Sequence, residues 1–165
     1  MRRTTTAHWA SALVAMLALL AAPAALAVVS CAVSASGVAF GIYNPLSGTP
    51  QNSTGTVTVT CTLLSGGNTT VNLSALLSAG SSGNFVTRTL VAGTQKLNYN
   101  LYWSTAYQQV WGDGTGGSFY GVASVPLTTG VPTQQVSGTM YGQIGAGQDV
   151  GPGAYLDTIV VTINY

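Results

Sequence analysis

The sequence predicts an all-β fold, an antiparallel β-sandwich, and two observations carry that prediction. Apolar and polar residues alternate in several short runs that are rich in Val, Thr and Tyr and are separated by glycine and asparagine. This is the pattern of half-buried strands joined by turns. In addition, no stretch of useful length after residue 28 has apolar residues at helical spacing. About seven strands at this spacing favour a sandwich over any α/β arrangement, and the uniform composition indicates one domain.

The N-terminus has the composition of a secretory signal peptide. Two arginines follow the initiator Met, an apolar stretch over residues 9–22 is too short to cross a bilayer, and Ala25-Leu26-Ala27 forms a small-x-small cleavage site. We therefore expect residues 1–27 to be removed and residues 28–165 to form the mature domain. Paired arginines also occur in twin-arginine signals, but the residues that usually follow them are missing, which favours Sec export.

The alternating runs predict strands in chain order. Residues 28–34 and 38–43 are the first two candidates, because each is a short apolar run next to small residues. Residues 55–63 alternate cleanly, with Val57, Val59 and Cys61 on one face and threonines on the other. A strand over residues 70–76 continues the sheet after a Ser-Gly-Gly-Asn turn.

Three more strands complete the expected set, over residues 96–103, 134–143 and 155–165. The first of them places Leu97, Tyr99 and Leu101 on one face. In the last, the residues of one face are Tyr155, Ile159, Val161, Ile163 and Tyr165, with Asp157 as the only interruption. Nothing follows this strand to pair with its free side. An exposed apolar edge needs a cover, from the same chain or from another.

Two cysteines, Cys31 and Cys61, remain after removal of the signal. In an exported chain, two cysteines most simply form one disulfide. A metal site or a reactive thiol is the alternative, but the only histidine, His8, lies in the predicted signal. A disulfide that closes a loop of about 30 residues should stabilise the fold by roughly 3–4 kcal/mol.

The charged residues are too few for several classes of function. The mature chain has Arg88 and Lys96 against three aspartates, and no glutamate. It therefore has no cluster of basic residues that could bind nucleic acid, and no basic amphipathic stretch that could bind a membrane surface. Without histidine or glutamate, no Ser-His-Asp or Cys-His arrangement can form. The glycine-rich run 112–117 has one carboxylate and no following lysine, so a turn fits it better than a calcium or phosphate site. We expect no enzyme, no metal and no cofactor.

Aromatic residues gather between residues 99 and 111. Exposed Tyr and Trp side chains are the usual platform for sugars, so a carbohydrate-binding or adhesive face is one interpretation. Its candidate residues are Tyr102, Trp103, Tyr107 and Trp111. Packing of these rings into the core is the other interpretation, and the favoured one.

An ordered set of motifs resembles the spore coat protein U domain family, which includes the subunits of archaic, Csu-type chaperone–usher pili. The resemblance covers essentially the whole mature chain. It is carried by Cys31, Val38-Ala39-Phe40-Gly41-Ile42-Tyr43, the run from Gly55 to Cys61, Leu97-Asn98-Tyr99-Asn100-Leu101-Tyr102, Trp111-Gly112-Asp113-Gly114, Tyr141-Gly142-Gln143-Ile144, and Gly153-Ala154-Tyr155-Leu156-Asp157-Thr158 leading to Tyr165.

The resemblance implies an immunoglobulin-like sandwich that lacks its last strand. A periplasmic chaperone would supply a strand first, and another subunit would replace it after passage to the outer-membrane usher. The expected acceptor edge comprises Leu156, Thr158, Ile159, Val160, Val161, Thr162, Ile163 and Tyr165, and the Tyr165 carboxylate would anchor the chaperone. The expected function is a secreted structural subunit of a bacterial surface fibre or spore coat, which crosses the periplasm to the cell surface.

The N-terminus departs from the pattern of this family. Shaft subunits of such pili carry a donor segment of about ten alternating residues before the first cysteine. Here only residues 28–30 lie between the predicted cleavage site and Cys31, a span of about 10 Å. We expect a subunit that accepts a strand but cannot donate one, at the distal tip of a fibre or in a coat. A self-contained carbohydrate-binding or adhesive module is the alternative.

Overall fold

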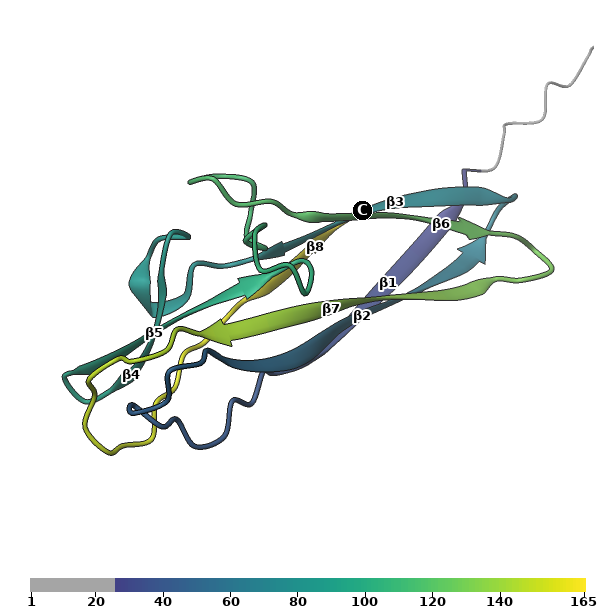
Figure 1. Cartoon of the computed structure of the whole chain (residues 1–165). Helices are drawn as coiled ribbons and strands as arrows, with labels where there is room; N and C mark the ends of the chain where they lie inside the picture. The colour runs from purple at the N-terminus through teal and green to yellow at the C-terminus, as the bar shows by residue number, and fades with distance from the viewer. Residues whose placement is uncertain (1–25) are drawn as a thin grey trace, which may run out of the picture.

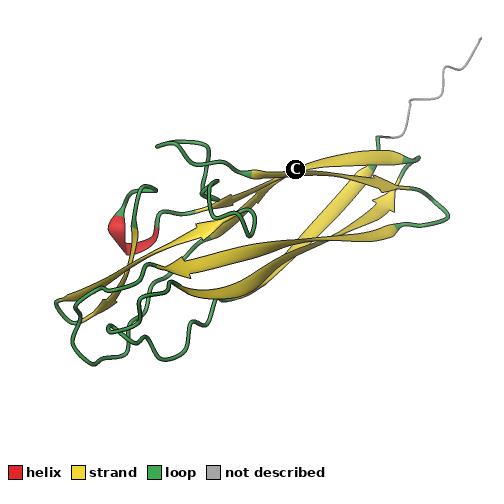
Figure 2. Ribbon diagram, in the orientation of Figure 1, coloured by secondary structure: helices red, strands yellow, loops and turns green. Residues whose placement is uncertain are grey.

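The computed structural model describes residues 26–165, which fold as a β-sandwich without an α-helix (Figures 1 and 2). Apart from its last two residues, the predicted signal peptide lies outside this part. No helix within the described part is long and apolar enough to span a membrane. The strands are β1 Val28–Ser36, β2 Gln51–Ser65, β3 Thr69–Leu77, β4 Arg88–Ala92, β5 Gln95–Tyr102, β6 Gly121–Leu127, β7 Thr133–Ile144 and β8 Val161–Asn164, with one 3-10 turn, η1, at Gly80–Ser82.

The strands form two antiparallel sheets. The larger sheet has the order β1-β2-β7-β5-β4 and the smaller has the order β6-β3-β8. Strands β2 and β7 pair over a long ladder that runs from Gln51 opposite Ile144 to Thr62 opposite Thr133. Figure 1 shows β3, β6 and β8 together in one layer, with β1, β2 and β7 in the layer below them.

The core lies between the faces that the alternation predicted. On β2, Val57, Val59 and Cys61 are at most 4% exposed, and the last two pack with residues of β3 and β6 in one apolar cluster. On β5, Leu97, Tyr99 and Leu101 are also buried and belong to a second cluster. Alternating apolar residues therefore face the opposite sheet on both strands, as expected for a sandwich.

Residues 38–43 do not form the predicted strand. Ser53 Oγ donates to the carbonyl of Ala39 at 2.7 Å, and the side-chain amide of Gln51 donates to the carbonyl of Phe40. Side chains thus take the place of a strand ladder. The rings and methyls of this segment lie over Gly142 of β7, where an added Cβ would come within 2.7 Å of Phe40. The segment is apolar because it packs on the sheet, not because it belongs to it.

The last predicted strand, residues 155–165, is a strand only over Val161–Asn164. Before that, the chain touches a neighbouring strand through the bridge between Leu156 and Val91 of β4. The chain crosses here from the edge of the larger sheet to the edge of the smaller one, which interrupts the ladder. The predicted alternation nevertheless persists: Tyr155, Asp157, Ile159, Val161 and Ile163 are half-buried and the residues between them are exposed.

The other edge of the smaller sheet is formed by β6, which carries an exposed proline, Pro126, opposite Thr70 of β3. Proline has no backbone N–H, so within sheets it is confined to edges, first positions and bulges. Neither β6 nor the short β4 was among the predicted strands.

Candidate functional site

The inward face of β1 is exposed to solvent at Val33 and Ala35, whereas Val29 and Cys31 on the same face pack against the core. Directly opposed residues of an antiparallel pair point to the same face; Val33 lies opposite Val59, and Ala35 opposite Val57. Val59 is 4% exposed, whereas Val33 is 48% exposed. Within residues 26–165, the smaller sheet does not extend over this end of β1. The sandwich is therefore open along β1.

Among the strands of residues 26–165, none pairs with β8 on the side away from β3. The N–H of Ser78 donates to the carbonyl of Val160 at 2.9 Å, while the N–H of Leu77, the residue opposite Val161, donates elsewhere, to Gly112. Because alternate residues of an antiparallel strand turn their backbone groups to opposite sides, the N–H and C=O of Val161 and Ile163 face the open edge. These groups are available to a further strand.

An apolar groove lies between β1 and the final segment. It consists of two adjoining clefts of about 790 and 380 Å³, which share Val38, Leu90 and Asp157. One wall is formed by residues 150–161 and the other by residues 35–45. The floor is formed by the inward-facing residues of the larger sheet, which are Leu90, Leu97, Tyr99, Leu101, Met140 and Ile144.

The eight predicted acceptor residues lie on or beside one wall, in different roles. Thr158, Ile159 and Val161 line the groove, and Ile163 packs into the interior beyond it. Val160 and Thr162 point outward and are exposed, and so is Tyr165. Leu156 is also exposed, but it borders the larger cleft. Leu156 already has a partner, since it exchanges backbone hydrogen bonds of 2.8 and 3.1 Å with Val91.

The opposite wall and the floor were missed in the sequence. Residues 38–43 of that wall were predicted as a strand, and the floor comes from strands that are distant in sequence. Tyr99 and Asp157 meet in the groove although 58 positions separate them. The contact forms only because the fold places the final segment over β5, so no local sequence pattern predicts it.

The Asp157 carboxylate is the polar centre of the groove. Its Oδ2 accepts a hydrogen bond from the Tyr99 hydroxyl at 2.7 Å, and its Oδ1 accepts from the N–H and Oγ of Ser81 at 2.8 and 2.7 Å. Burial, and then the hydrogen bond to Asp157, raise the pKa of Tyr99 well above its ordinary value of 10.0. The Tyr99 hydroxyl is therefore held in its neutral, donating form.

Arg88 is a fully buried cation whose hydrogen bonds go to neutral groups. Its Nε and Nη2 donate to the Ser78 carbonyl at 3.1 and 2.9 Å. Nη1 donates to the side-chain oxygen of Asn100, and Nη2 to the Trp111 carbonyl, both at 2.7 Å. Burial lowers the pKa of Arg88 from its ordinary value. The guanidinium thereby ties β4 to β5 and to the loops on either side.

We expect the fold to lose stability progressively as pH rises above about 10. The pKa of Tyr99 is higher in the folded than in the unfolded chain, so its stabilising contribution is complete below the unfolded value of 10.0 and declines above it. Urea unfolding between about pH 8 and pH 11 should show a falling midpoint, and Tyr99→Phe should flatten that slope. An unchanged slope in Tyr99→Phe would assign the effect to other tyrosines.

The predicted adhesive aromatics comprise one core residue, two half-buried residues and one exposed residue. Trp111 is 1% exposed and its indole N–H donates to the Ala75 carbonyl at 2.9 Å, so it is a core residue and not a surface platform. Trp103 packs edge-on against it, with ring centroids 4.6 Å apart. Tyr102 and Tyr107 pack edge-on against each other and are half-buried. Of the four, Trp103 is the most exposed, and it lines a separate cleft of about 320 Å³ with residues of β6 and β7.

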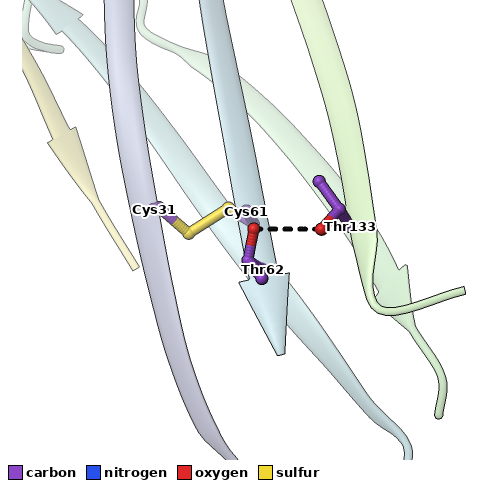
Figure 3. Close-up of a disulfide and its surroundings, with 4 residues drawn as sticks. All are labelled: Cys31, Cys61, Thr62 and Thr133. Atoms are coloured by element: carbon purple, nitrogen blue, oxygen red, sulfur yellow. Dashed lines mark hydrogen bonds between the residues drawn. A yellow bond between two sulfur atoms is a disulfide. The ribbon is translucent and has the colours of Figure 1, made fainter. Parts of the chain in front are cut away.

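Cys31 and Cys61 form the predicted disulfide (Figure 3). The two residues are directly opposite in the ladder of β1 and β2. Next to it, on the other face of β2, the hydroxyls of Thr62 and Thr133 share a hydrogen bond of 3.1 Å, which links β2 to β7. The disulfide therefore fixes β1, an edge strand, to β2, which lies between β1 and β7 in the sheet.

Comparison with known proteins identifies the family. The profile of the Spore Coat Protein U domain matches residues 16–162. This chain belongs to the Spore Coat Protein U domain family. A relative, Protein U of Myxococcus xanthus, is 35% identical over 135 residues, in a match that covers 76% of this chain and 70% of the relative.

A solved structure has the same fold as this family member. It is a chain of the CsuC–CsuE chaperone–tip adhesion subunit pre-assembly complex from the archaic chaperone–usher Csu pili of Acinetobacter baumannii. The two superpose with a TM-score of 0.50 at 19% sequence identity, over 84% of this chain and 40% of that chain. This chain thus spans well under two thirds of the other. The likeness confirms the predicted all-β sandwich of two antiparallel sheets.

Proposed function

We propose that this protein is a non-enzymatic structural subunit of a bacterial surface fibre or spore coat, and that its groove accepts a β-strand from another chain. The observation that carries the proposal is that Ala35 of β1 and Val161 of β8 line one cleft, and that the other edge of β8 is unpaired among the described strands. A strand in the groove would pair with Val161 and Ile163 and would also cover Val33. The family and the fold both support this role.

The partners follow from the same assembly route. A periplasmic chaperone supplies the first strand, and another subunit replaces it at the outer-membrane usher. Sec export delivers the subunit to the periplasm. The final location is the cell surface.

The subunit is an acceptor that does not donate through its N-terminus. Residues 28–30 are already paired, since they lie in β1 opposite residues 62–65 of β2. With cleavage after Ala27, no segment would be free to reach a neighbouring groove. This arrangement suits the distal tip of a fibre. A self-contained sugar-binding module fits less well, because it would leave the face of β1 uncovered for no purpose.

Strand capture is the direct test. The mature domain should bind synthetic ten-residue peptides with alternating apolar residues, and a strand fused through a linker to Tyr165 should raise its thermal midpoint. A scrambled peptide of the same composition is the control. A domain that is indifferent to all peptides, and to the fused strand, would contradict the proposal.

Val33→Asp should separate strand capture from folding. Val33 is 48% exposed in the free domain, so the substitution should change the free energy of unfolding by less than about 0.5 kcal/mol. A bound strand would bury the carboxylate, so peptide affinity should fall at least about 100-fold. Its matched control is Val59→Asp, at the opposed position that is 4% exposed, which should unfold the domain. Undiminished peptide binding by Val33→Asp would place the strand elsewhere.

A further inference from the structure

One stretch of the groove wall has no strand partner of its own. Leu156 pairs with Val91 of β4, and the ladder with β3 begins at Val161. Among the described residues, no backbone hydrogen bond joins residues 157–159 to a neighbouring strand. Yet these residues line the groove. Side chains must therefore hold this part of the wall when the groove is empty.

The Asp157 side chain provides that attachment. Its carboxylate joins the wall to η1 through Ser81 and to the groove floor through Tyr99. Its Oδ1 also accepts the N–H of Thr158 at 2.8 Å, which fixes the direction of the chain after it. Hydrogen bonds to an ionised acceptor are roughly twice as strong as those between neutral groups. One residue thus anchors the wall at two separate places.

The absence of a side chain at Gly80 leaves room for this carboxylate. A Cβ at residue 80 would lie 2.2 Å from Asp157 Oδ2, so a larger residue would displace the carboxylate. Gly83, at the other end of η1, has a similar φ of +70° against +65° for Gly80, but an added Cβ there would have no atom within 4 Å. The close approach to Asp157 therefore distinguishes Gly80 from a glycine needed for its turn alone.

The loop from Ser78 to Ser81, which contacts Asp157, is itself held in place by hydrogen bonds. The buried Arg88 donates two hydrogen bonds to the Ser78 carbonyl. Ser78 in turn holds Val160, through its N–H and through its Oγ, each at 2.9 Å. Residues 78–81 are thus a rigid support that grips the wall at Val160 and at Asp157, on both sides of Ile159.

We propose that Asp157 is a positioning residue that keeps residues 157–159 in place while the groove is empty. The inference rests on the proposed function and deepens it, because it makes the groove preformed and not shaped by the arriving strand. After capture, the new ladder beside β8 holds the same wall. Asp157 therefore acts mainly on the rate of strand association, since a groove that is competent only part of the time captures more slowly.

Gly80→Ala and Gly83→Ala form a matched pair for the test. Both place a Cβ at a positive φ at an end of η1, but only Gly80→Ala displaces the Asp157 carboxylate. We expect Gly80→Ala to slow association of a fluorescent strand peptide at least about tenfold relative to Gly83→Ala, with dissociation within about twofold. Asp157→Ala should repeat this result, and Asp149→Asn, which removes an exposed carboxylate elsewhere, should behave as wild type.

Amide hydrogen exchange gives a second readout, which does not depend on measuring the rates of peptide binding. In free Gly80→Ala, the amides of Ser81 and Thr158 should exchange faster than in Gly83→Ala, and peptide binding should remove the difference at Thr158. Equal association rates for the two glycine variants would overturn the positioning role. So would a loss that appears equally in association, dissociation and global stability. If the wild type captures no peptide, the proposed function fails first, and this inference with it.

Discussion

Arg88→Met should cost the folded state about 3–5 kcal/mol, which is a large fraction of the stability of a typical domain. Removal of the guanidinium leaves the carbonyls of Ser78 and Trp111 without donors. The side-chain oxygen of Asn100 loses one of its two donors and keeps the N–H of Leu101. Each buried unpaired acceptor costs about 1–3 kcal/mol. Urea unfolding with linear extrapolation is the measurement.

Two further variants make the Arg88 result specific. Arg88→Lys keeps the charge but not the planar fork, so it should recover only part of the loss. Lys96→Met removes the exposed cation of β5 and should change stability by less than about 0.5 kcal/mol. An Arg88→Met domain as stable as wild type would show that the buried cation does not organise this end of the sandwich.

Loss of the disulfide should be the second large effect, about 3–4 kcal/mol in the chain-entropy description. The bond spans a sequence separation of 30 residues. Reduction should free β1 first, because it is an edge strand whose inward side is exposed at Val33 and Ala35. The amides of β1 should therefore lose hydrogen-exchange protection before those of β2. The measurement is urea unfolding of the wild type with and without dithiothreitol.

The double variant Cys31→Ala/Cys61→Ala is the control for reduction. It should have the stability of the reduced wild type and should not respond to dithiothreitol. A bound strand should restore much of the protection of β1, because it covers Val33. Equal loss of protection in every strand on reduction would contradict a local role for the bond at the groove.

The parts of the fold that local alternation determines were predictable from sequence. Residues 55–63 and 96–103 alternate because one face is buried, and both form strands with the predicted faces inward. Residues 38–43 are equally apolar, but side chains of β2 hold their carbonyls. Alternation of apolar and polar residues indicates which side chains are buried, not whether the backbone pairs. A coil that packs on a sheet can therefore show the same pattern as a strand.

Of the candidate site, one wall could be predicted from the sequence, but the residues that meet it in space could not. Alternation located the wall at residues 155–165, and Asp157 stood out as its single polar interruption. Its partners Ser81 and Tyr99 come from η1 and β5, and their convergence depends on how the two sheets cross. The exposure of Val33 likewise depends on where the smaller sheet ends. Such features are set by tertiary geometry and leave no local trace in the sequence.

The proline in β6 gives the smaller sheet two unequal edges. At Pro126 the outer edge lacks an N–H that an added strand would need, whereas the edge at β8 offers its backbone groups at Val161 and Ile163. Strand addition can therefore extend this sheet in one direction only. An acceptor subunit would thus be held on its neighbour in one orientation, and uncontrolled pairing with further sheets would end at β6.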